Sequence, residues 1–187
     1  MDIKYLSCAE TAKLVRKALK KEFPEVKFSV RSRDCDAIYI SWTDGPTEKM
    51  VEDVTGSFEG AGFDGMIDLE YYKTSWMLPS GEVGLARSEG TEDSMGCNPA
   101  INNSIPPGAE LVSFGAKYIF GNRTVSPPKM EAARLKVCEY WGLDPSDYKF
   151  KDETGYNGYK WVSIPKDWIT NANNCFDKLV LNEAYSS

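Results

Sequence analysis

Four carboxylate side chains gather around a glycine-rich turn in the first half of this sequence. Glu59 and Asp64 lie among closely spaced glycines, and Asp68 and Glu70 follow in a segment, Met66–Tyr72, that is typical of a strand. Side chains two residues apart on a strand point to the same face, so Asp68 and Glu70 are expected to face the same way. Carboxylates assist phosphodiester cleavage either as a general base or by holding Mg²⁺ that activates water. These acids are therefore candidates for catalysis, with Mg²⁺ the only cofactor to consider; the alternative is a set of solvated surface acids beside a turn.

The sequence contains no histidine, which removes the commonest general base and a common metal ligand. Any catalysis must then rely on carboxylates, Lys, Arg, Tyr, Ser or Cys. The five cysteines are widely spread without a Cys-x-x-Cys pair, so neither a disulfide framework nor a zinc site is expected. Cys8 has no histidine partner and falls on an apolar helical stripe, so it is not a candidate nucleophile.

Cations recur at helical spacing near the N-terminus and continue into the first predicted hairpin. Such a face neutralises phosphates without sequence specificity, although most lysine-rich helix faces are simply solvated. The candidate nucleic-acid-binding residues are Lys13, Arg16, Lys17, Lys20 and Lys27, continued by Lys21, Arg31 and Arg33.

Two residues of the first predicted hairpin extend the catalytic hypothesis. Arg31 and Tyr39 are expected to share a sheet face with Asp68 or Glu70, which would bring a guanidinium, a phenol and a carboxylate together. The predicted catalytic set is therefore Glu59, Asp64, Asp68, Arg31 and Tyr39.

Charge and aromatic side chains point to two kinds of partner. Residues 34–70 hold ten acids and one base, Lys49, whereas residues 1–33 hold nine bases and four acids, so the net charge of −6 conceals a strong asymmetry. The acidic residues of the 34–70 segment are a candidate for a local patch that mimics DNA phosphates. The aromatic residues are typical either of stacking platforms for single-stranded bases or of cores and protein interfaces. They are Trp76, Tyr118, Phe120, Tyr140, Trp141, Tyr148, Tyr156, Tyr159, Trp161 and Trp168.

The elements that must position these residues form an α+β pattern. A capping box of Ser7 and Glu10 begins a helix that ends before Pro24. Two alternating runs then predict a hairpin, Pro46 begins a second helix, and Met66–Tyr72 is followed by a weaker hairpin across residues 79–81. The order α-β-β-α-β-β predicts an antiparallel sheet with helices on one face.

The loop-like composition of residues 88–108 predicts a linker between two domains, 1–87 and 109–187. The second part is expected to be a smaller α+β region, with a hairpin at Gly121-Asn122, a helix after Pro127, short strands at Tyr148–Phe150 and Tyr159–Ile164, and a final helix over Lys166–Leu181. No apolar run is long enough to span a membrane and no signal core begins the sequence, so we expect a protein of the host bacterial cytoplasm.

Three motifs occur in order over residues 5–78: YLSCAETAKLVRKALKKEFPEVKFSVRS, ISWTDGP and FEGAGFDGMIDLEYY. They resemble the large polyvalent protein-associated domain numbered 29. The family occurs in very large proteins of phages and conjugative elements, so the resemblance implies a mobile-element origin without implying a reaction. In this protein we expect the domain to stand nearly alone, followed by a C-terminal part of about 80 residues.

Small acidic proteins of that origin are often anti-restriction or anti-CRISPR factors. By this association we expect an anti-CRISPR inhibitor of a type II RNA-guided effector nuclease, with that nuclease and its guide RNA as partners. One mechanism is ribonuclease cleavage of the guide RNA. The other is inhibition without catalysis, by binding the effector or another nucleic-acid-handling defence enzyme in the manner of anti-restriction proteins and DNA mimics.

Overall fold

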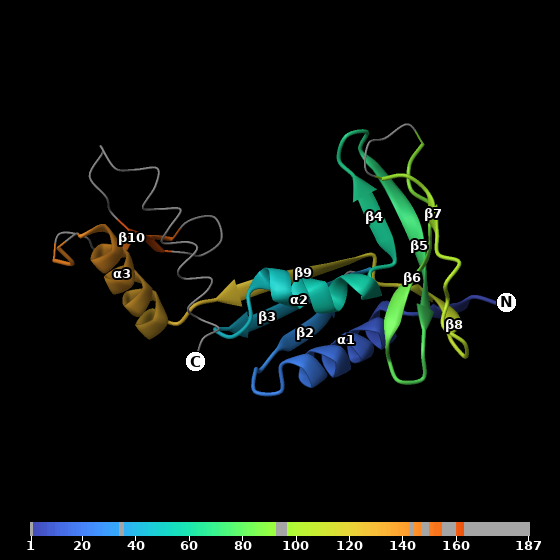
Figure 1. The fold of residues 1–187 in the computed structure, drawn as a ribbon, viewed down its shortest axis with the longest axis horizontal. Helices are drawn as coiled ribbons and strands as arrows, with labels where there is room; N and C mark the ends of the chain where they lie inside the picture. Colours follow the sequence, from blue (N-terminus) through green and yellow to red (C-terminus); the bar gives the residue numbers. More distant parts are fainter. Residues whose placement is uncertain are drawn as a thin grey trace. The chain divides into compact units, whose positions relative to one another are not determined.

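The computed structural model describes residues 2–33, 36–92, 97–142, 144–146, 150–154 and 160–162. The chain divides into two compact units. The first comprises Met1–Ser41 and Lys49–Asn122, and the second comprises Trp42–Glu48 and Arg123–Ser187. Figure 1 gives the order of the elements.

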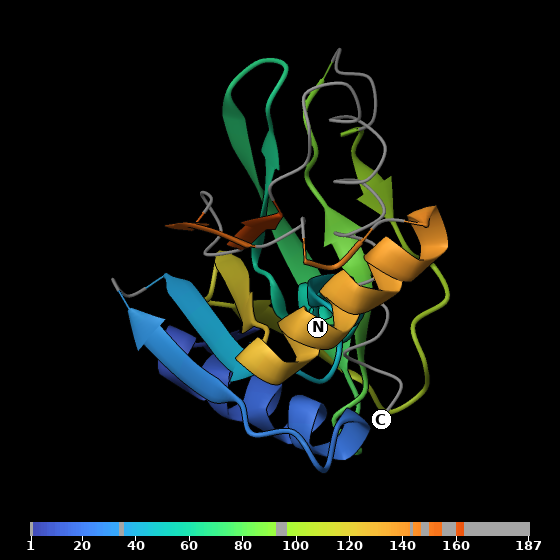
Figure 2. The same cartoon turned by 90° about the vertical axis from the view of Figure 1, so that its left-hand side faces the viewer.

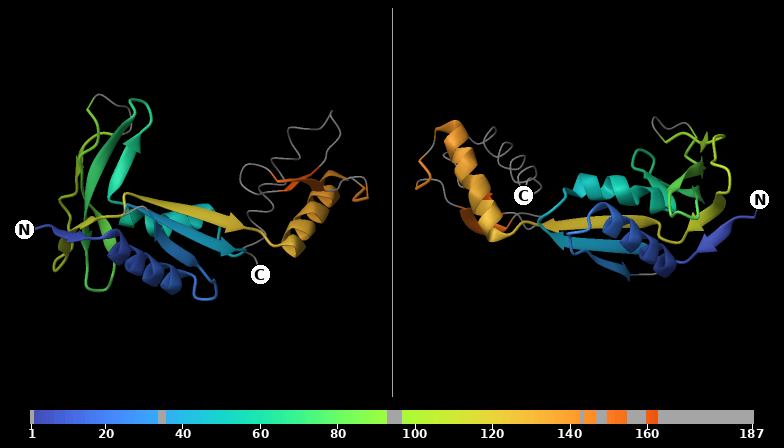
Figure 3. Two further views of the ribbon diagram at one scale, coloured as in Figure 1. Left: turned by 180° about the vertical axis from the view of Figure 1, so that it is seen from behind. Right: turned by 60° about the horizontal axis from the view of Figure 1, so that its bottom comes forward.

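Helix α1 (Cys8–Glu22) begins as the sequence predicts. The Ser7 hydroxyl accepts the Glu10 N–H, and the Glu10 carboxylate accepts the Ser7 N–H, so the capping box is formed. One stripe of the helix is buried, with Val15 and Leu19 almost inaccessible. The helix lies beside strand β2, as both views in Figure 3 show.

A three-stranded sheet contains β2 (Ser29–Arg33), β3 (Ala37–Thr43) and β9 (Tyr118–Thr124), in the order β2-β3-β9. The predicted hairpin of β2 and β3 is confirmed, with Arg31 opposite Tyr39. Alternate residues of β3 are buried and exposed, which gives the sheet one core face and one open face. After β3 come α2 (Glu48–Thr55) and the short 3₁₀ helix η1 (Gly56–Phe58), which bury Val51 and Phe58.

A six-stranded sheet holds the remaining strands of the first unit. They are β1 (Lys4–Leu6), β4 (Ala61–Asp64), β5 (Leu69–Met77), β6 (Val83–Ser88), β7 (Ala100–Ile101) and β8 (Glu110–Phe114). The order is β1-β8-β5-β6-β7, with β4 also paired to β5, and β1 runs parallel to β8. Since β8 lies beyond residues 88–108 in the chain, this sheet draws strands from both sides of the predicted linker.

The predicted strand over Met66–Tyr72 is wrong at its start. Residues 61–64 and 69–72 pair as an antiparallel hairpin, and residues 65–68 form its turn. Asp68 adopts a left-handed backbone with φ of 55°, a conformation that Asp tolerates better than most residues. Figure 2 shows the hairpin of β4 and β5, which is joined to the segment after β6 by hydrogen bonds from Glu89 to Tyr72 and from Thr91 to Asp64.

The second unit contains helix α3 (Pro127–Trp141) and a two-stranded antiparallel sheet of β10 (Phe150–Thr154) and β11 (Lys160–Val162). The helix ends at Gly142, whose φ of 63° suits a glycine C-cap. The two short strands predicted in this part correspond to β10 and β11, with shifted bounds. The hairpin predicted at Gly121-Asn122 is wrong, because β9 runs through both residues as one strand. The predicted final helix over 166–181 lies outside the described residues.

The α+β class is confirmed, with three α-helices and two mixed sheets of six and three strands, beside the small β10–β11 ladder, in the described ranges. The single antiparallel sheet expected from the sequence is replaced by two because β9 and β8, far along the chain, pair with early strands. No helix in the described part of the chain is long and apolar enough to cross a membrane.

Candidate functional site

The start of β9 and the residue before it, residues 117–119, bring two of the predicted carboxylates together. The backbone N–H groups of Lys117 and Tyr118 donate to the Asp36 carbonyl, at 2.6 and 3.4 Å, which fixes this segment beside the β2–β3 turn. Glu70 accepts hydrogen bonds from the side chains of Lys117 and Tyr118, and Glu59 accepts the backbone N–H of the next residue, Ile119. We call the resulting group the carboxylate–lysine cluster, and it consists of Glu59, Glu70, Lys73, Lys117 and Tyr118.

Glu59 follows η1 and occupies a half-buried position. One of its oxygens accepts the N–H of Ile119 at 3.0 Å, and the other lies 3.8 Å from Nζ of Lys73. Burial raises the pKa of Glu59 above its ordinary value, and the Ile119 N–H and Lys73 oppose that shift only in part. A carboxylate with a raised pKa is a better proton acceptor at neutral pH than an ordinary one.

Glu70 lies on β5 and holds two side chains at once. Its carboxylate accepts hydrogen bonds from Nζ of Lys117 and from the Tyr118 hydroxyl, each at 2.7 Å. These bonds lower the pKa of Glu70, whereas burial and the bond to Glu70 raise the pKa of Tyr118 to about 12. The bond to Glu70 also raises the pKa of Lys117. At neutral pH Glu70 is therefore an anion, Lys117 a cation and Tyr118 a neutral donor.

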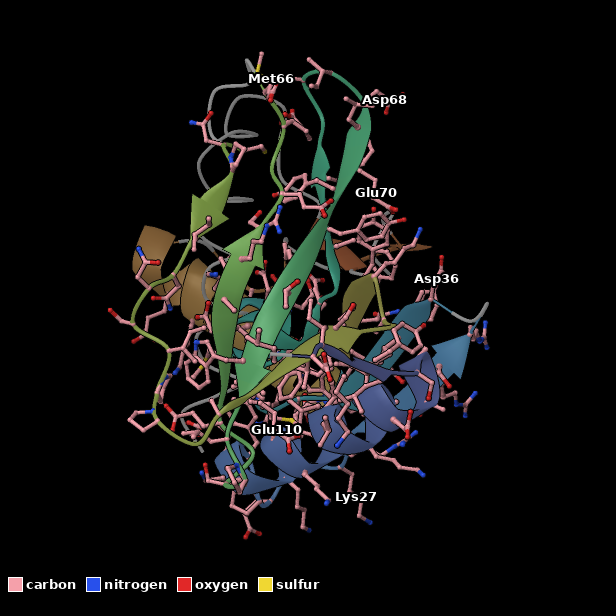
Figure 4. All side chains as sticks on the ribbon, turned by 90° about the vertical axis from the view of Figure 1, so that its right-hand side faces the viewer. Lys27, Asp36, Met66, Asp68, Glu70 and Glu110 are labelled. Atoms are coloured by element: carbon pink, nitrogen blue, oxygen red, sulfur yellow. The ribbon has the colours of Figure 1, made fainter. Side chains whose placement is uncertain are left out.

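The other two acids lie apart from this cluster. Asp64 is almost completely buried at the end of β4, where it accepts the Met66 N–H at 2.9 Å and the Thr91 hydroxyl at 2.5 Å. It therefore shapes the hairpin turn. Asp68 is exposed within that turn, and Figure 4 shows it at the far end of the hairpin with Glu70 further along β5. The expected pairing of Asp68 and Glu70 on one strand face is wrong, because Asp68 precedes the strand.

Arg31 and Tyr39 face each other across β2 and β3 on the open face of the three-stranded sheet. Glu70 belongs to the six-stranded sheet, so the expected common sheet face is wrong. Tyr39 is nevertheless linked to Glu70 through rings of β9: the Tyr39 ring lies 5.3 Å from that of Phe120, and the Phe120 ring lies 6.3 Å from that of Tyr118.

The predicted cationic face is present on α1. Lys13, Lys17 and Lys20 are exposed, and Lys27 lies just beyond the helix and is also exposed. Arg16 differs, because its guanidinium donates to the Val30 carbonyl at 2.5 Å and so ties α1 to β2. A shallow, open depression is lined by Arg16, Lys17, Lys20 and Lys21.

Sequence reasoning misses Lys73 and Lys117 as members of the cluster. Both are isolated lysines without a motif, and Lys117 lies 47 residues from its partner Glu70. No local signal identifies such residues. Within the part of the chain that the structure describes, no group of three or more Asp, Glu, Cys or His side chains is placed to hold a metal ion.

Comparison with known proteins identifies the family of the chain. No curated protein and no solved structure shows significant similarity to it. The family model of large polyvalent protein associated domain 29 matches residues 6–126. The match extends well beyond residue 78, where the motifs end. It includes α1, strands β2 to β9 and the whole carboxylate–lysine cluster. The chain therefore belongs to the large polyvalent protein associated domain 29 family, which is typical of the polyvalent proteins of mobile genetic elements.

Proposed function

We propose that the protein is an anti-defence factor of a mobile genetic element, which inhibits a type II RNA-guided effector nuclease by cleaving its guide RNA. The supporting observation is the carboxylate–lysine cluster, in which a half-buried Glu59 with a raised pKa lies 3.8 Å from the ammonium of Lys73. A proton acceptor beside cations is the minimum that RNA cleavage needs in a chain without histidine.

In the proposed reaction, the Glu59 carboxylate accepts the proton of a ribose 2′-hydroxyl. The 2′-oxygen then bonds to the adjacent phosphorus, and the bond from phosphorus to the 5′-oxygen breaks. The products are a 2′,3′-cyclic phosphate and a 5′-hydroxyl, whose proton comes from water. The ammonium groups of Lys73 and Lys117 stabilise the negative charge on the phosphoryl oxygens. Glu70 acts as a positioning residue, because its two hydrogen bonds of 2.7 Å hold Lys117 and Tyr118.

The test is turnover. The protein is incubated with an about tenfold excess of assembled effector–guide complex, and the RNA is sized on a denaturing gel. Shortened RNA is expected with the wild type, and Glu59→Gln should slow cleavage about 10²-fold or more, the scale of a lost general base. Glu110→Gln is the matched control, because Glu110 is an exposed acid on β8 whose ion-pair partner is the exposed Lys4, at 3.6 Å. Intact RNA in the wild-type reaction would rule out the enzymatic mechanism.

A second candidate, inhibition by binding the effector itself, is favoured by the hairpin of β4 and β5. Phe63, Met66, Ile67 and Leu69 are 53%, 78%, 44% and 51% exposed, although each is a large apolar side chain. Such a cluster is typical of protein contact surfaces. If this candidate is right, inhibition occurs with intact RNA at one inhibitor per effector, and the double variant Met66→Asp, Leu69→Asp abolishes it while Glu59→Gln does not.

A further inference from the structure

Three aromatic rings form a row on the open face of the three-stranded sheet. Tyr39 on β3 and Phe120 on β9 are 42% and 48% exposed, unusually high values for large rings in the middle of strands. Tyr118, partly exposed, lies next to Phe120 on β9. We call Tyr39, Phe120 and Tyr118 the aromatic row.

Neighbouring rings of the row contact each other. The centroids of Tyr39 and Phe120 lie 5.3 Å apart at an interplanar angle of 31°, and those of Phe120 and Tyr118 lie 6.3 Å apart at 32°. Neighbouring rings with similar tilt present faces on which successive unpaired bases stack. Open sheet faces that carry two or three such rings are a recurring way of binding single-stranded RNA.

Cations lie at both ends of the aromatic row. Arg33 lies over the Tyr39 ring, with its guanidinium carbon 6.0 Å from the ring centroid, and the exposed Arg31 is the cross-strand neighbour of Tyr39. At the other end, Lys117 lies beside Tyr118 and within 5.7 Å of the Tyr72 ring centroid. Two acids, Asp36 and Glu70, also lie near this end, and Glu70 is neutralised by Lys117 at 2.7 Å. Rings flanked by cations fit a strand whose bases stack and whose phosphates need positive partners.

We infer that the aromatic row binds an unpaired RNA strand by base stacking, with Arg31 and Arg33 contacting its phosphates. The row ends at Tyr118, whose hydroxyl donates to Glu70 of the carboxylate–lysine cluster. The inference rests on the proposed function, which makes RNA the substrate. It further specifies single-stranded RNA as the substrate of the carboxylate–lysine cluster. A paired stem would not expose its base faces, so a linker or loop of the guide is the segment that fits.

The experiment measures binding of the full chain by fluorescence anisotropy, in the Glu59→Gln background so that the RNA stays intact. The probes are a labelled unpaired RNA of about 12 nucleotides, a duplex of the same sequence and the corresponding single-stranded DNA. Single-stranded RNA should bind more tightly than the duplex. Phe120→Leu and Tyr39→Leu should each weaken its binding by about 5- to 150-fold, the range measured for loss of one stacked base. Phe120→Trp should preserve binding, because it retains a ring.

Tyr5→Leu is the matched control, since Tyr5 is a 68% exposed ring on β1, outside the aromatic row, and its removal should leave affinity unchanged. Equal affinity for duplex and single strand, or unchanged affinity in Phe120→Leu, would overturn the inference. Tighter binding of DNA than of RNA would overturn its assignment to RNA.

The two proposals fail separately. If ring-dependent binding is found while the wild type leaves all RNA intact, the cleavage proposal fails and the stacking surface stands. If the wild type cuts RNA and Phe120→Leu both binds and cuts it normally, the stacking inference fails and the cleavage proposal stands.

Discussion

The substitution Gly60→Ala should destabilise the protein more than any other glycine-to-alanine change around the turn that precedes β4. Gly60 follows Glu59 and lies where two segments meet without room for a side chain. Its N–H donates to the Ala116 carbonyl at 2.8 Å, and its own carbonyl accepts the Lys73 N–H at 2.9 Å. A Cβ at this position would overlap the carbonyl oxygen of Phe114 and lie 3.0 Å from the Phe114 carbonyl carbon.

The size of the effect follows from these contacts. The overlap is with backbone, which cannot rotate away as a side chain would, so the chain around Gly60 must move and strain both hydrogen bonds. Each bond contributes about 1 kcal/mol, and each buried group left unpaired costs about 1–3 kcal/mol. We therefore expect the free energy of unfolding to fall by about 2–4 kcal/mol. This is a large part of the about 5–15 kcal/mol of a typical domain, yet it leaves the protein folded.

Urea denaturation followed by circular dichroism measures this change. With a slope of about 1–3 kcal/mol per molar urea, the midpoint should fall by about 0.7–4 M. Gly56→Ala is the matched control, because a Cβ at Gly56 meets no atom within 4 Å and the residue needs no left-handed backbone. It should be neutral or stabilise by about 0.4–1 kcal/mol. If Gly60→Ala unfolds within about 0.5 kcal/mol of the wild type, or if Gly56→Ala is destabilised as much, the close approach at Gly60 does not exist as described.

Three other perturbations test the electrostatics. Burial raises the pKa of Glu59 above its ordinary value of 4.5, so the folded state binds this proton more tightly than the unfolded state. The proton therefore contributes to the free energy of unfolding below pH 4.5, and this contribution is lost as the pH rises through the pKa of the folded state. Glu59→Gln should therefore gain stability relative to the wild type between about pH 4 and pH 7 in urea titrations, and a constant difference would contradict the burial of this carboxyl. Absorbance titration of wild type minus Tyr118→Phe should reveal a phenol that ionises near pH 12, and a midpoint near 10 would mean that Tyr118 is neither shielded from solvent nor bonded to Glu70. The triple change Lys13→Gln, Lys17→Gln and Lys20→Gln should flatten the dependence of log RNA affinity on log salt by about 0.7 for each phosphate that these lysines neutralise in the wild type, whereas an unchanged slope would mean that this helix face is only solvated.

Local patterns in the sequence are sufficient to predict some elements and insufficient for others. Helix α1 is predictable because its cap and its buried stripe are both encoded within sixteen consecutive positions, 7–22. The hairpin of β2 and β3 is predictable because alternation is also a local pattern. The start of β5 is misplaced because an apolar run, residues 66–67, lies in a turn where Asp68 has a positive φ.

Pairings between distant segments leave no comparable signal. The parallel pairing of β1 with β8 joins residues about a hundred positions apart, and nothing near residue 4 or residue 112 announces it. The same holds for the site: Glu59 and Glu70 stand out as acids near a glycine-rich turn, whereas Lys73 and Lys117 gain significance only when β5 and β9 come together. Clustered carboxylates are a recognisable pattern in a sequence, whereas the isolated lysines that neutralise them are not.

Residues 112–119 contact many segments of the first unit, and these contacts determine when that unit can fold. Residues 112–114 pair with β1, Gly115 donates to the Leu6 carbonyl at 2.6 Å, Ala116 accepts from Gly60, and residues 117–119 bind Asp36, Glu59 and Glu70. These contacts all join residues that are far apart in the chain, so forming them costs loop-closure entropy and is expected late in folding. During synthesis, β1 cannot pair with β8 until residue 114 has left the ribosome. Until that moment β1 lacks its partner strand, the Gly60 N–H lacks the Ala116 carbonyl, and Glu59 and Glu70 lack their hydrogen bonds to residues 117–119. We expect slow, all-or-none folding of this unit, with the amide hydrogens of residues 115–119 among the last to exchange with solvent.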